Sequence, residues 1–142
     1  MASVPWNLVL VAVVAGAVLA FAAAEPDVEP RRLSAIDFND AVRKKKHSVL
    51  VNFCVSWSEH CERMNSVWAG VATAVSHSPL QGAGVIVATV SCESDRDICE
   101  RYGINAFPAI RLFTKGDDKH PLVYEGSRDV NSVYRWLEGH RS

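Results

Sequence analysis

The fold is decided by residues 49–61, which read Val-Leu-Val-Asn-Phe-Cys-Val-Ser-Trp-Ser-Glu-His-Cys. The first half of this stretch is apolar and rich in β-branched residues, which is typical of a strand buried on both faces of a sheet. The second half leads into a helical pattern with Met64, Trp68 and Val71 on one face. We therefore expect a buried strand over residues 48–55 that passes into a helix over about 58–77.

The remainder of the chain alternates between strand and helix patterns. The expected strands are a short edge strand at 32–34, a buried strand over 85–90, a strand over 109–113 and its return over 122–124. The expected helices begin at Asp37, span 95–102 before Gly103, and follow a cap at Asp129. Composition predicts a loop over 78–84 and a turn over 115–118. This order predicts an α/β fold with a central mixed sheet flanked by helices.

The N-terminal part has the pattern of a targeting segment. Residues 8–24 are apolar, uncharged and rich in small side chains, and they end in three alanines before Glu25. This pattern predicts a signal peptide over 1–24, cleaved after Ala24, with a linker over 25–31 and one domain over 32–142. Retention of the apolar run as a membrane anchor is the alternative, because its length is near the lower limit for spanning.

The charge balance argues against partners that are recognised by a strong electric field. The chain has 15 basic and 16 acidic residues, for a net charge of −1. Its basic run, Arg43 to His47, falls where a helix is expected to end, and cations there complement the helix dipole. We therefore expect neither nucleic acid nor an acidic membrane surface as a partner.

Four segments, in order, resemble the thioredoxin fold of the protein disulfide isomerase family. Residues 57–61 resemble a Trp-Cys-Gly-His-Cys site whose first cysteine is Ser58, and residues 90–104 are similar to the family's Val-Asp-Cys…Cys-x-x-Tyr-Gly-Val stretch. Residues 107–113 resemble its cis-proline loop and the strand that follows. Residues 124–128, followed by a helix that contains Trp136, complete the series. The resemblance spans about residues 32–140 and implies a thioredoxin fold.

The exchange at Ser58 affects the chemistry that the resemblance implies. A dithiol site has its attacking cysteine at a helix N-terminus, where the thiol pKa falls from about 8.5 toward 3.5–7, and a second cysteine resolves the mixed disulfide. The Ser58 hydroxyl does not ionise near neutral pH, and it can cap the helix instead. Ser58 and Cys61 are thus expected to form a degenerate catalytic site. Asn52 is a second departure, because the family often has a buried Glu or Asp there that moves protons.

Three states are open for Cys61, which has the resolving position. It can be an inert buried thiol, a single thiol with weak reactivity toward clients, or one half of a disulfide. Cys54 is the obvious partner for such a disulfide, because it ends the strand that leads into the site. The sequence does not decide among the three, since a disulfide requires α-carbons within about 7 Å.

The other cysteine pair is assigned by the resemblance. Cys92 and Cys99 match two family cysteines, which implies a structural disulfide that an oxidising compartment permits. Zinc binding is the alternative, but the cysteines lack paired Cys-x-x-Cys spacing and His60 neighbours Cys61 alone. We expect no metal and no cofactor.

The resemblance also implies residues that bind clients. Phe107-Pro108 should be a cis peptide bond, and the backbone before it docks client peptides by strand-like hydrogen bonds. Trp57, His60, Phe107 and Pro108 are therefore the expected substrate-binding residues. Packing of the two aromatic rings in the core is the alternative.

Arg128 matches a family arginine that approaches the active site and lowers the pKa of the resolving thiol. It is therefore counted with Cys61 and Ser58 as a catalytic residue. The alternative is a surface charge that pairs with Glu125 or Asp129.

These observations lead to one functional hypothesis with two rivals. The hypothesis is a secretory-pathway protein, in the endoplasmic reticulum lumen or secreted, that engages cysteine-containing or unfolded polypeptides with absent or weak dithiol oxidoreductase activity. The first rival is an active thiol–disulfide isomerase that works through Cys61. The second is a non-catalytic module that binds one fixed protein partner.

Overall fold

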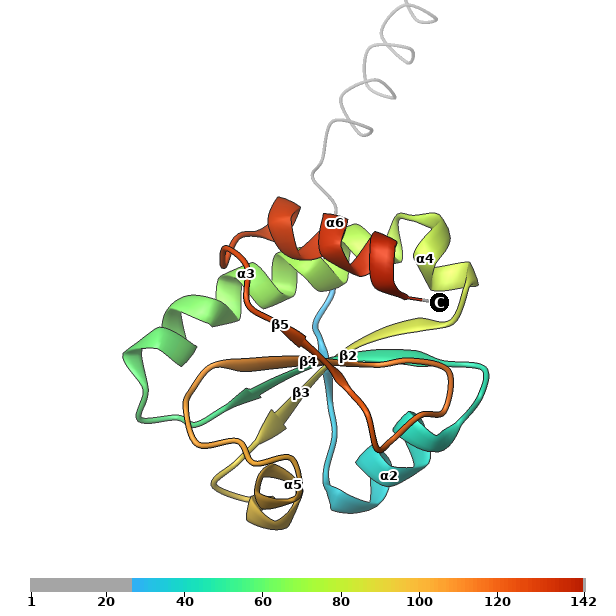
Figure 1. Cartoon of the computed structure of the whole chain (residues 1–142). Coiled ribbons are helices and arrows are strands. Elements are labelled where there is room, and N and C mark those ends of the chain that lie inside the picture. The colour runs from blue at the N-terminus through green and yellow to red at the C-terminus, as the bar shows by residue number, and fades with distance from the viewer. Residues whose placement is uncertain (1–26, 142) are drawn as a thin grey trace, which may run out of the picture.

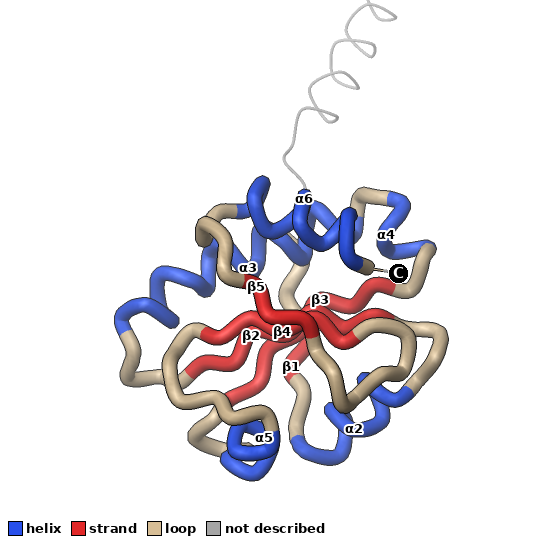
Figure 2. The backbone as a smooth tube through the Cα atoms, in the orientation of Figure 1, coloured by secondary structure: helices blue, strands red, loops and turns tan. Residues whose placement is uncertain are grey.

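A five-stranded mixed sheet forms the centre of the computed structural model, which describes residues 27–141 (Figures 1 and 2). The strands, in spatial order, are β1 (Arg31–Arg32), β3 (Val85–Ser91), β2 (Ser48–Cys54), β4 (Ala109–Phe113) and β5 (Leu122–Tyr124). β1, β3 and β2 run parallel, whereas β4 and β5 are antiparallel to their neighbours. β2 lies between β3 and β4, which explains why its residues are almost all apolar.

Helices cover both faces of the sheet, as Figure 1 shows. One face carries α2 (Ala35–Arg43) and the short α5 (Arg96–Arg101). The other face carries α3 (Glu59–Ser76), the one-turn α4 (Pro79–Gly82) and α6 (Val130–His140). The expected mixed sheet flanked by helices is confirmed, and this architecture is the thioredoxin fold.

Each face of the sheet has its own apolar core. Beneath α2 and α5, the ring of Phe38 meets Phe53, Tyr102 and Phe113 in edge-on contacts, with ring centroids 5.4–6.2 Å apart. Beneath α3 and α6, Trp68 is fully buried and donates its indole N–H to the carbonyl of Ala88 at 2.7 Å. The hydrogen bond from Trp68 to Ala88 attaches α3 directly to strand β3.

The register of the parallel strands brings two loops together at one end of the sheet. Cys54, the last residue of β2, lies opposite Ser91, the last residue of β3. The chain leaves β2 toward α3 and leaves β3 toward α5, and the two loops are joined where the N–H of Cys92 donates to the carbonyl of Cys54 at 2.9 Å. The carboxyl ends of parallel strands are where α/β sheets commonly bind ligands.

Several expected boundaries differ from the structure. The first helix begins at Ala35, after Ser34, rather than at Asp37, and β1 takes Arg31 from the expected linker. The prediction of a loop over 78–84 was wrong in part, because α4 forms there. Ser78 caps α4 by accepting from the N–H of Leu80, and Pro79 stands at the first helical position, where a missing N–H is harmless.

The predicted signal peptide over 1–24 lies outside the described residues. Within 27–141, no helix has both the length and the apolar character that a membrane crossing requires.

Candidate functional site

The helix α3 begins at Ser58, which acts as its N-cap. Its Oγ accepts a hydrogen bond from the N–H of Cys61 at 3.3 Å, and its carbonyl accepts from the N–H of Glu62 at 3.0 Å. These bonds satisfy donors that a helix start otherwise leaves unpaired. The hydroxyl at the attacking position therefore has a structural role.

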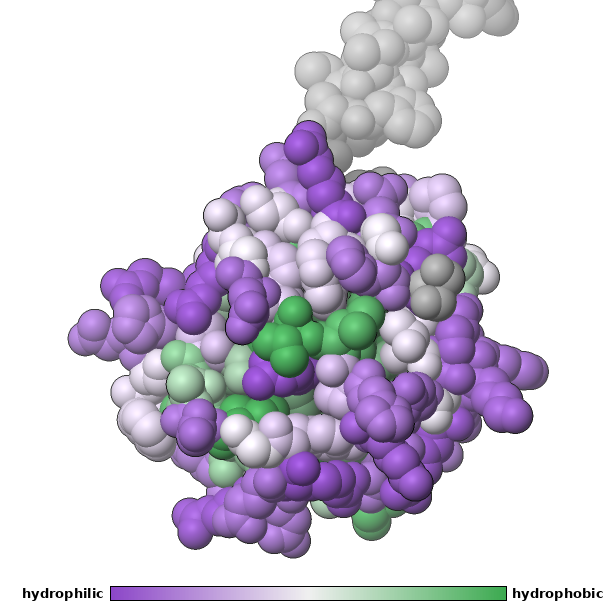
Figure 3. All heavy atoms as spheres, in the orientation of Figure 1, coloured by the Kyte–Doolittle hydropathy of each residue, from purple (hydrophilic) through white to green (hydrophobic). Residues whose placement is uncertain are grey.

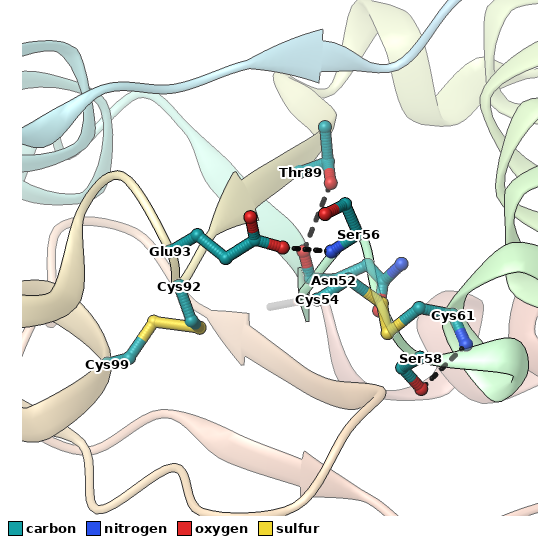
Figure 4. The surroundings of a disulfide bond; sticks show 9 residues. All are labelled: Asn52, Cys54, Ser56, Ser58, Cys61, Thr89, Cys92, Glu93 and Cys99. Carbon is teal, nitrogen blue, oxygen red and sulfur yellow. Dashed lines mark hydrogen bonds between the residues drawn. A yellow bond between two sulfur atoms is a disulfide. The ribbon is translucent and has the colours of Figure 1, made fainter.

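Cys61 is bonded to Cys54 in the structure (Figure 4). Their α-carbons are 5.7 Å apart, within the range that a disulfide spans. Cys61 is the third residue of α3 and is only 3 % exposed, whereas Cys54 at the end of β2 is half-buried. Of the three states that the sequence left open for Cys61, the structure has the disulfide with Cys54, and neither sulfur is a free thiol.

The second disulfide joins Cys92 to Cys99, and their α-carbons are 5.8 Å apart. It ties the residue after β3 to the fourth residue of α5. Both cysteines are buried, at 7 % and 3 % exposed, in the apolar core beneath α2 and α5. This is the pairing that the family resemblance implied.

Asn52 lies beneath the Cys54–Cys61 disulfide and is 2 % exposed. Its Oδ1 is 3.5 Å from Cys54 Sγ, and its backbone carbonyl accepts a hydrogen bond from the Thr89 hydroxyl at 3.3 Å. The side-chain amide has no proton to exchange near neutral pH. Asn52 therefore offers the sulfur a polar neighbour but no route for proton transfer.

Trp57 is an exposed aromatic side chain, with 73 % of its surface accessible. Its ring meets Phe107 edge to face, with the ring centroids 6.0 Å apart. The Phe107–Pro108 bond is cis, and Pro108 is buried, so the loop presents Phe107 beside the indole. Core packing, the alternative role for both rings, does not hold for the exposed Trp57, whereas the half-buried Phe107 packs in part against the apolar core beneath α2 and α5.

His60 is exposed on the first turn of α3, where its Nδ1 lies 2.9 Å from an Arg63 guanidinium nitrogen. The contact therefore joins two exposed residues, one turn apart, on the surface of α3.

Two cavities lie near these residues, and each is lined by a different subset of the expected site residues. The larger, of about 840 Å³, is lined by Asn52, Cys54 and Cys61 together with the start of α3 and the loop after β3. The smaller, of about 350 Å³, is lined by Pro108 and Arg128. Arg128 is exposed and lines a different cavity from Cys61.

A contact that the sequence did not reveal joins the two disulfide-bearing loops. Glu93 accepts a hydrogen bond from the N–H of Ser56, as Figure 4 shows. Hydrogen bonds from the Ser56 side chain and backbone lower the pKa of the Glu93 carboxyl below its ordinary value. The two residues are 37 positions apart, and only the parallel pairing of β2 with β3 makes them neighbours.

Metal binding has no support in the geometry of residues 27–141. No three side chains of His, Cys, Asp or Glu converge there in the way that a metal centre requires.

Comparison with known proteins places this chain in the thioredoxin family. The sequence profile of the thioredoxin family matches residues 29–139. Protein disulfide-isomerase 5-1 of Arabidopsis thaliana is 31 % identical over 97 residues, which cover 68 % of this chain and 62 % of that protein. The protein disulfide-isomerase of Oryctolagus cuniculus is 29 % identical over 116 residues, which cover 82 % of this chain and 22 % of that protein.

The solved structures agree at the level of the fold. Human ERp44, in its crystal form II, superposes with a TM-score of 0.71 at 21 % identity, over 83 % of this chain and 32 % of that chain. The present chain thus spans between about a fifth and three fifths of the curated relatives named above.

Proposed function

Because the chain belongs to the thioredoxin family, we propose that it is a protein disulfide isomerase-like domain of the secretory pathway. In this proposal it engages cysteine-containing or unfolded polypeptides, and its Ser58-x-x-Cys61 turn has absent or weak dithiol oxidoreductase activity. The relatives named protein disulfide-isomerase support the class of client. The signal-peptide pattern over 1–24 supports entry into the secretory pathway, with the lumen of the endoplasmic reticulum or the cell exterior as the destination.

The observation that carries the proposal is the exposed Trp57 indole, which stands on the half-buried Phe107 ring. An indole that is 73 % exposed leaves much apolar area in water, and burial of apolar surface stabilises a complex by about 25 cal/mol per Å². The pair stands beside the cis Phe107–Pro108 bond, where the exposed Asn105 and Ala106 lead into the loop. A client segment in extended conformation can pack a side chain on the rings and align its backbone with the loop.

The degenerate turn is the reason for proposing weak dithiol activity. Ser58 caps α3 and cannot form a mixed disulfide with a client. Asn52 cannot supply or remove a proton for Cys61, as a carboxyl at that place would. Engagement of clients therefore depends first on noncovalent contact.

The test is the binding of a reduced, alkylated and hence permanently unfolded polypeptide, followed by calorimetry. Trp57→Ala and Phe107→Ala should each weaken binding by about 5- to 30-fold, corresponding to about 1–2 kcal/mol for an aromatic anchor. Ile36→Ala is the matched control, because Ile36 is 84 % exposed and lies on α2, on the opposite face of the sheet from α3. Ile36→Ala should change the affinity by less than about twofold.

Two results would contradict the proposal. One is wild-type protein that binds no unfolded polypeptide at concentrations up to the millimolar range. The other is a Trp57→Ala variant that binds as tightly as wild type.

A further inference from the structure

The Cys54–Cys61 disulfide forms part of the wall of the larger cavity. The cavity measures about 840 Å³, and both cysteines line it, as do Asn52 and the polar residues Glu62 and Asn65 of α3. Cys92 and Cys99 do not line either cavity. Of the two disulfides, only Cys54–Cys61 lines either of these two cavities, and the larger cavity has room for a thiol on a peptide or a small molecule.

The two sulfurs of this disulfide are not equivalent. Cys61 is 3 % exposed, whereas Cys54 is half-buried at the end of β2. Thiol–disulfide exchange requires the incoming thiolate to reach one sulfur, and its rate depends on which sulfur is accessible. Attack from the cavity should therefore fall on Cys54 Sγ.

The geometry also favours Cys61 as the leaving sulfur. Cys61 is the third residue of an 18-residue helix, in the first turn, where the helix dipole stabilises negative charge. A thiol whose thiolate is stabilised in this way is a faster leaving group. The accessibility of Cys54 and the leaving ability of Cys61 thus both favour attack on Cys54 Sγ.

Asn52 offers a contact that suits the reduced state. Its buried Oδ1 lies 3.5 Å from Cys54 Sγ, but a sulfur in a disulfide carries no hydrogen to donate. Once the disulfide is reduced, the Cys54 S–H can donate to this oxygen. The reduced pair then has a hydrogen bond that the oxidised pair lacks.

We propose that Cys54–Cys61 is a thiol-exchange site in which Cys54 is the reacting sulfur, and that its substrate is a thiol on a client polypeptide or on glutathione. The polypeptide part of this proposal rests on the proposed function. The pair replaces the Ser58-x-x-Cys61 turn as the place of sulfur chemistry, with the reacting residue again N-terminal to Cys61.

The exchange proceeds in two balanced steps. A thiolate attacks Cys54 Sγ, the Cys54–Cys61 bond breaks, a mixed disulfide forms on Cys54, and Cys61 leaves as a thiolate that takes a proton from solvent. A second thiolate attacks the substrate sulfur of that mixed disulfide, which releases an oxidised substrate disulfide and the Cys54 thiolate, which is then protonated. Two substrate thiols are oxidised, and the chain's disulfide is reduced to two thiols.

The first arm of the test uses wild-type oxidised protein and reduced glutathione, so no variant has to fold. The reaction is quenched with an alkylating reagent at set times, and mass spectrometry reads each cysteine. Cys54 and Cys61 should become labelled at least about tenfold faster than Cys92 and Cys99, which are an internal control of buried, cavity-free sulfur. Equal rates for the two disulfides, or faster opening of Cys92–Cys99, would overturn the proposal.

The second arm identifies the reacting sulfur and the source of the thiol. With oxidised glutathione, Cys61→Ala should form an adduct on Cys54, and Cys54→Ala should form one on Cys61 at least about tenfold more slowly. The reverse order would overturn the assignment of Cys54. A reduced polypeptide with two cysteines then replaces glutathione; its oxidation by the wild type, lost in Cys54→Ala, supports a protein substrate.

The two proposals fail separately. If Trp57→Ala leaves noncovalent client binding unchanged while glutathione still opens Cys54–Cys61, the client-binding proposal fails and the exchange site stands. If clients bind through Trp57 but glutathione opens neither disulfide selectively, the exchange site fails alone.

Discussion

The two disulfides of this domain have the same covalent plan in different surroundings. Each joins cysteines seven residues apart, with α-carbons 5.7 Å and 5.8 Å from each other, and each ties the end of a parallel strand to the helix that follows. Cys54–Cys61 opens onto a cavity at the start of an 18-residue helix, whereas Cys92–Cys99 is enclosed in the core beside a six-residue helix. The surroundings of a disulfide, rather than its loop length, therefore decide whether it can serve in exchange.

Because the two loops have equal length, the contribution of loop closure to stability can be separated from the contribution of the folded-state surroundings. Closing a loop of about eight residues lowers the entropy of the unfolded chain by the same amount for both, which corresponds to about 2.5 kcal/mol. Any difference between the disulfides must then come from what surrounds them in the folded state.

The largest expected effect is on stability. Cys92→Ala with Cys99→Ala should lower the free energy of unfolding by about 3–4 kcal/mol, because the cavity left in the core adds to the lost loop constraint. Cys54→Ala with Cys61→Ala should cost about 1 kcal/mol less, since Cys54 is only half-buried. Urea unfolding of both double variants measures the two losses of unfolding free energy. A larger loss for the Cys54–Cys61 pair would contradict the expected effect of burial.

The next effect concerns the activity that each loop can regain. Ser58→Cys restores a Cys-x-x-Cys spacing at the start of α3, and insulin reduction should rise at least about tenfold, because the new thiol lies at the N-cap of a long helix. Arg96→Cys is the matched control, with the same spacing to Cys99 at the start of the six-residue α5, and should raise the rate less than about twofold.

Two outcomes of this experiment would change the account. High activity of the unsubstituted protein that persists in Cys54→Ala would contradict the proposal that the Ser58–Cys61 turn is degenerate. No gain in Ser58→Cys would show that the surroundings of α3 no longer support dithiol chemistry, which favours the rival in which the domain binds one fixed partner.

A smaller effect is expected at the cap of α3. Ser58→Ala should cost about 1 kcal/mol of unfolding free energy, because the N–H of Cys61 loses its acceptor. Ser58→Asp retains an acceptor at the N-cap and should stay within about 0.5 kcal/mol of wild type. Thermal or urea unfolding of the pair measures the difference, and equal losses in both variants would show that the hydroxyl does not cap the helix.

The smallest effect is the pH dependence of the contact between the two loops. Hydrogen bonds from Ser56 lower the pKa of Glu93 in the folded state, so the ionised carboxyl stabilises the fold above its ordinary pKa. This stabilisation is lost as the pH falls through the lower folded-state pKa. Glu93→Gln should therefore differ from wild type in unfolding free energy near neutral pH, and the difference should vanish in acid; a difference that is constant with pH would contradict the contact.

Most of the fold was accessible from the sequence, because local patterns carry it. The apolar run over 48–55 predicted β2, and the period of Met64, Trp68 and Val71 predicted α3, since burial on two faces or on one leaves a direct trace in composition. The α4 turn was missed because a four-residue helix leaves no periodic pattern, and Ser78-Pro79 suits a loop as well as a helix start.

The candidate site was accessible only in part. The exchange of cysteine for Ser58 and the pairing partner Cys54 could be named from the sequence, but the choice of a disulfide over a free thiol depended on a distance set by how α3 leaves β2. The Ser56–Glu93 contact and the placement of Arg128 and Cys61 in the walls of different cavities arise from strand register and loop placement. Such long-range placement has no local signal in a single sequence.

If the sulfur chemistry of this domain rests on Cys54 bonded to Cys61, a peptide map of the oxidised protein shows that bond directly. Cleavage after Glu59 separates Cys54 from Cys61, and cleavage after Arg96 separates Cys92 from Cys99, so digestion without reduction leaves linked peptides for mass spectrometry. We expect one linked pair of peptides that contains Cys54 and Cys61 and a second that contains Cys92 and Cys99. Free thiols at Cys54 and Cys61, or a bond between either of them and Cys92 or Cys99, would contradict it.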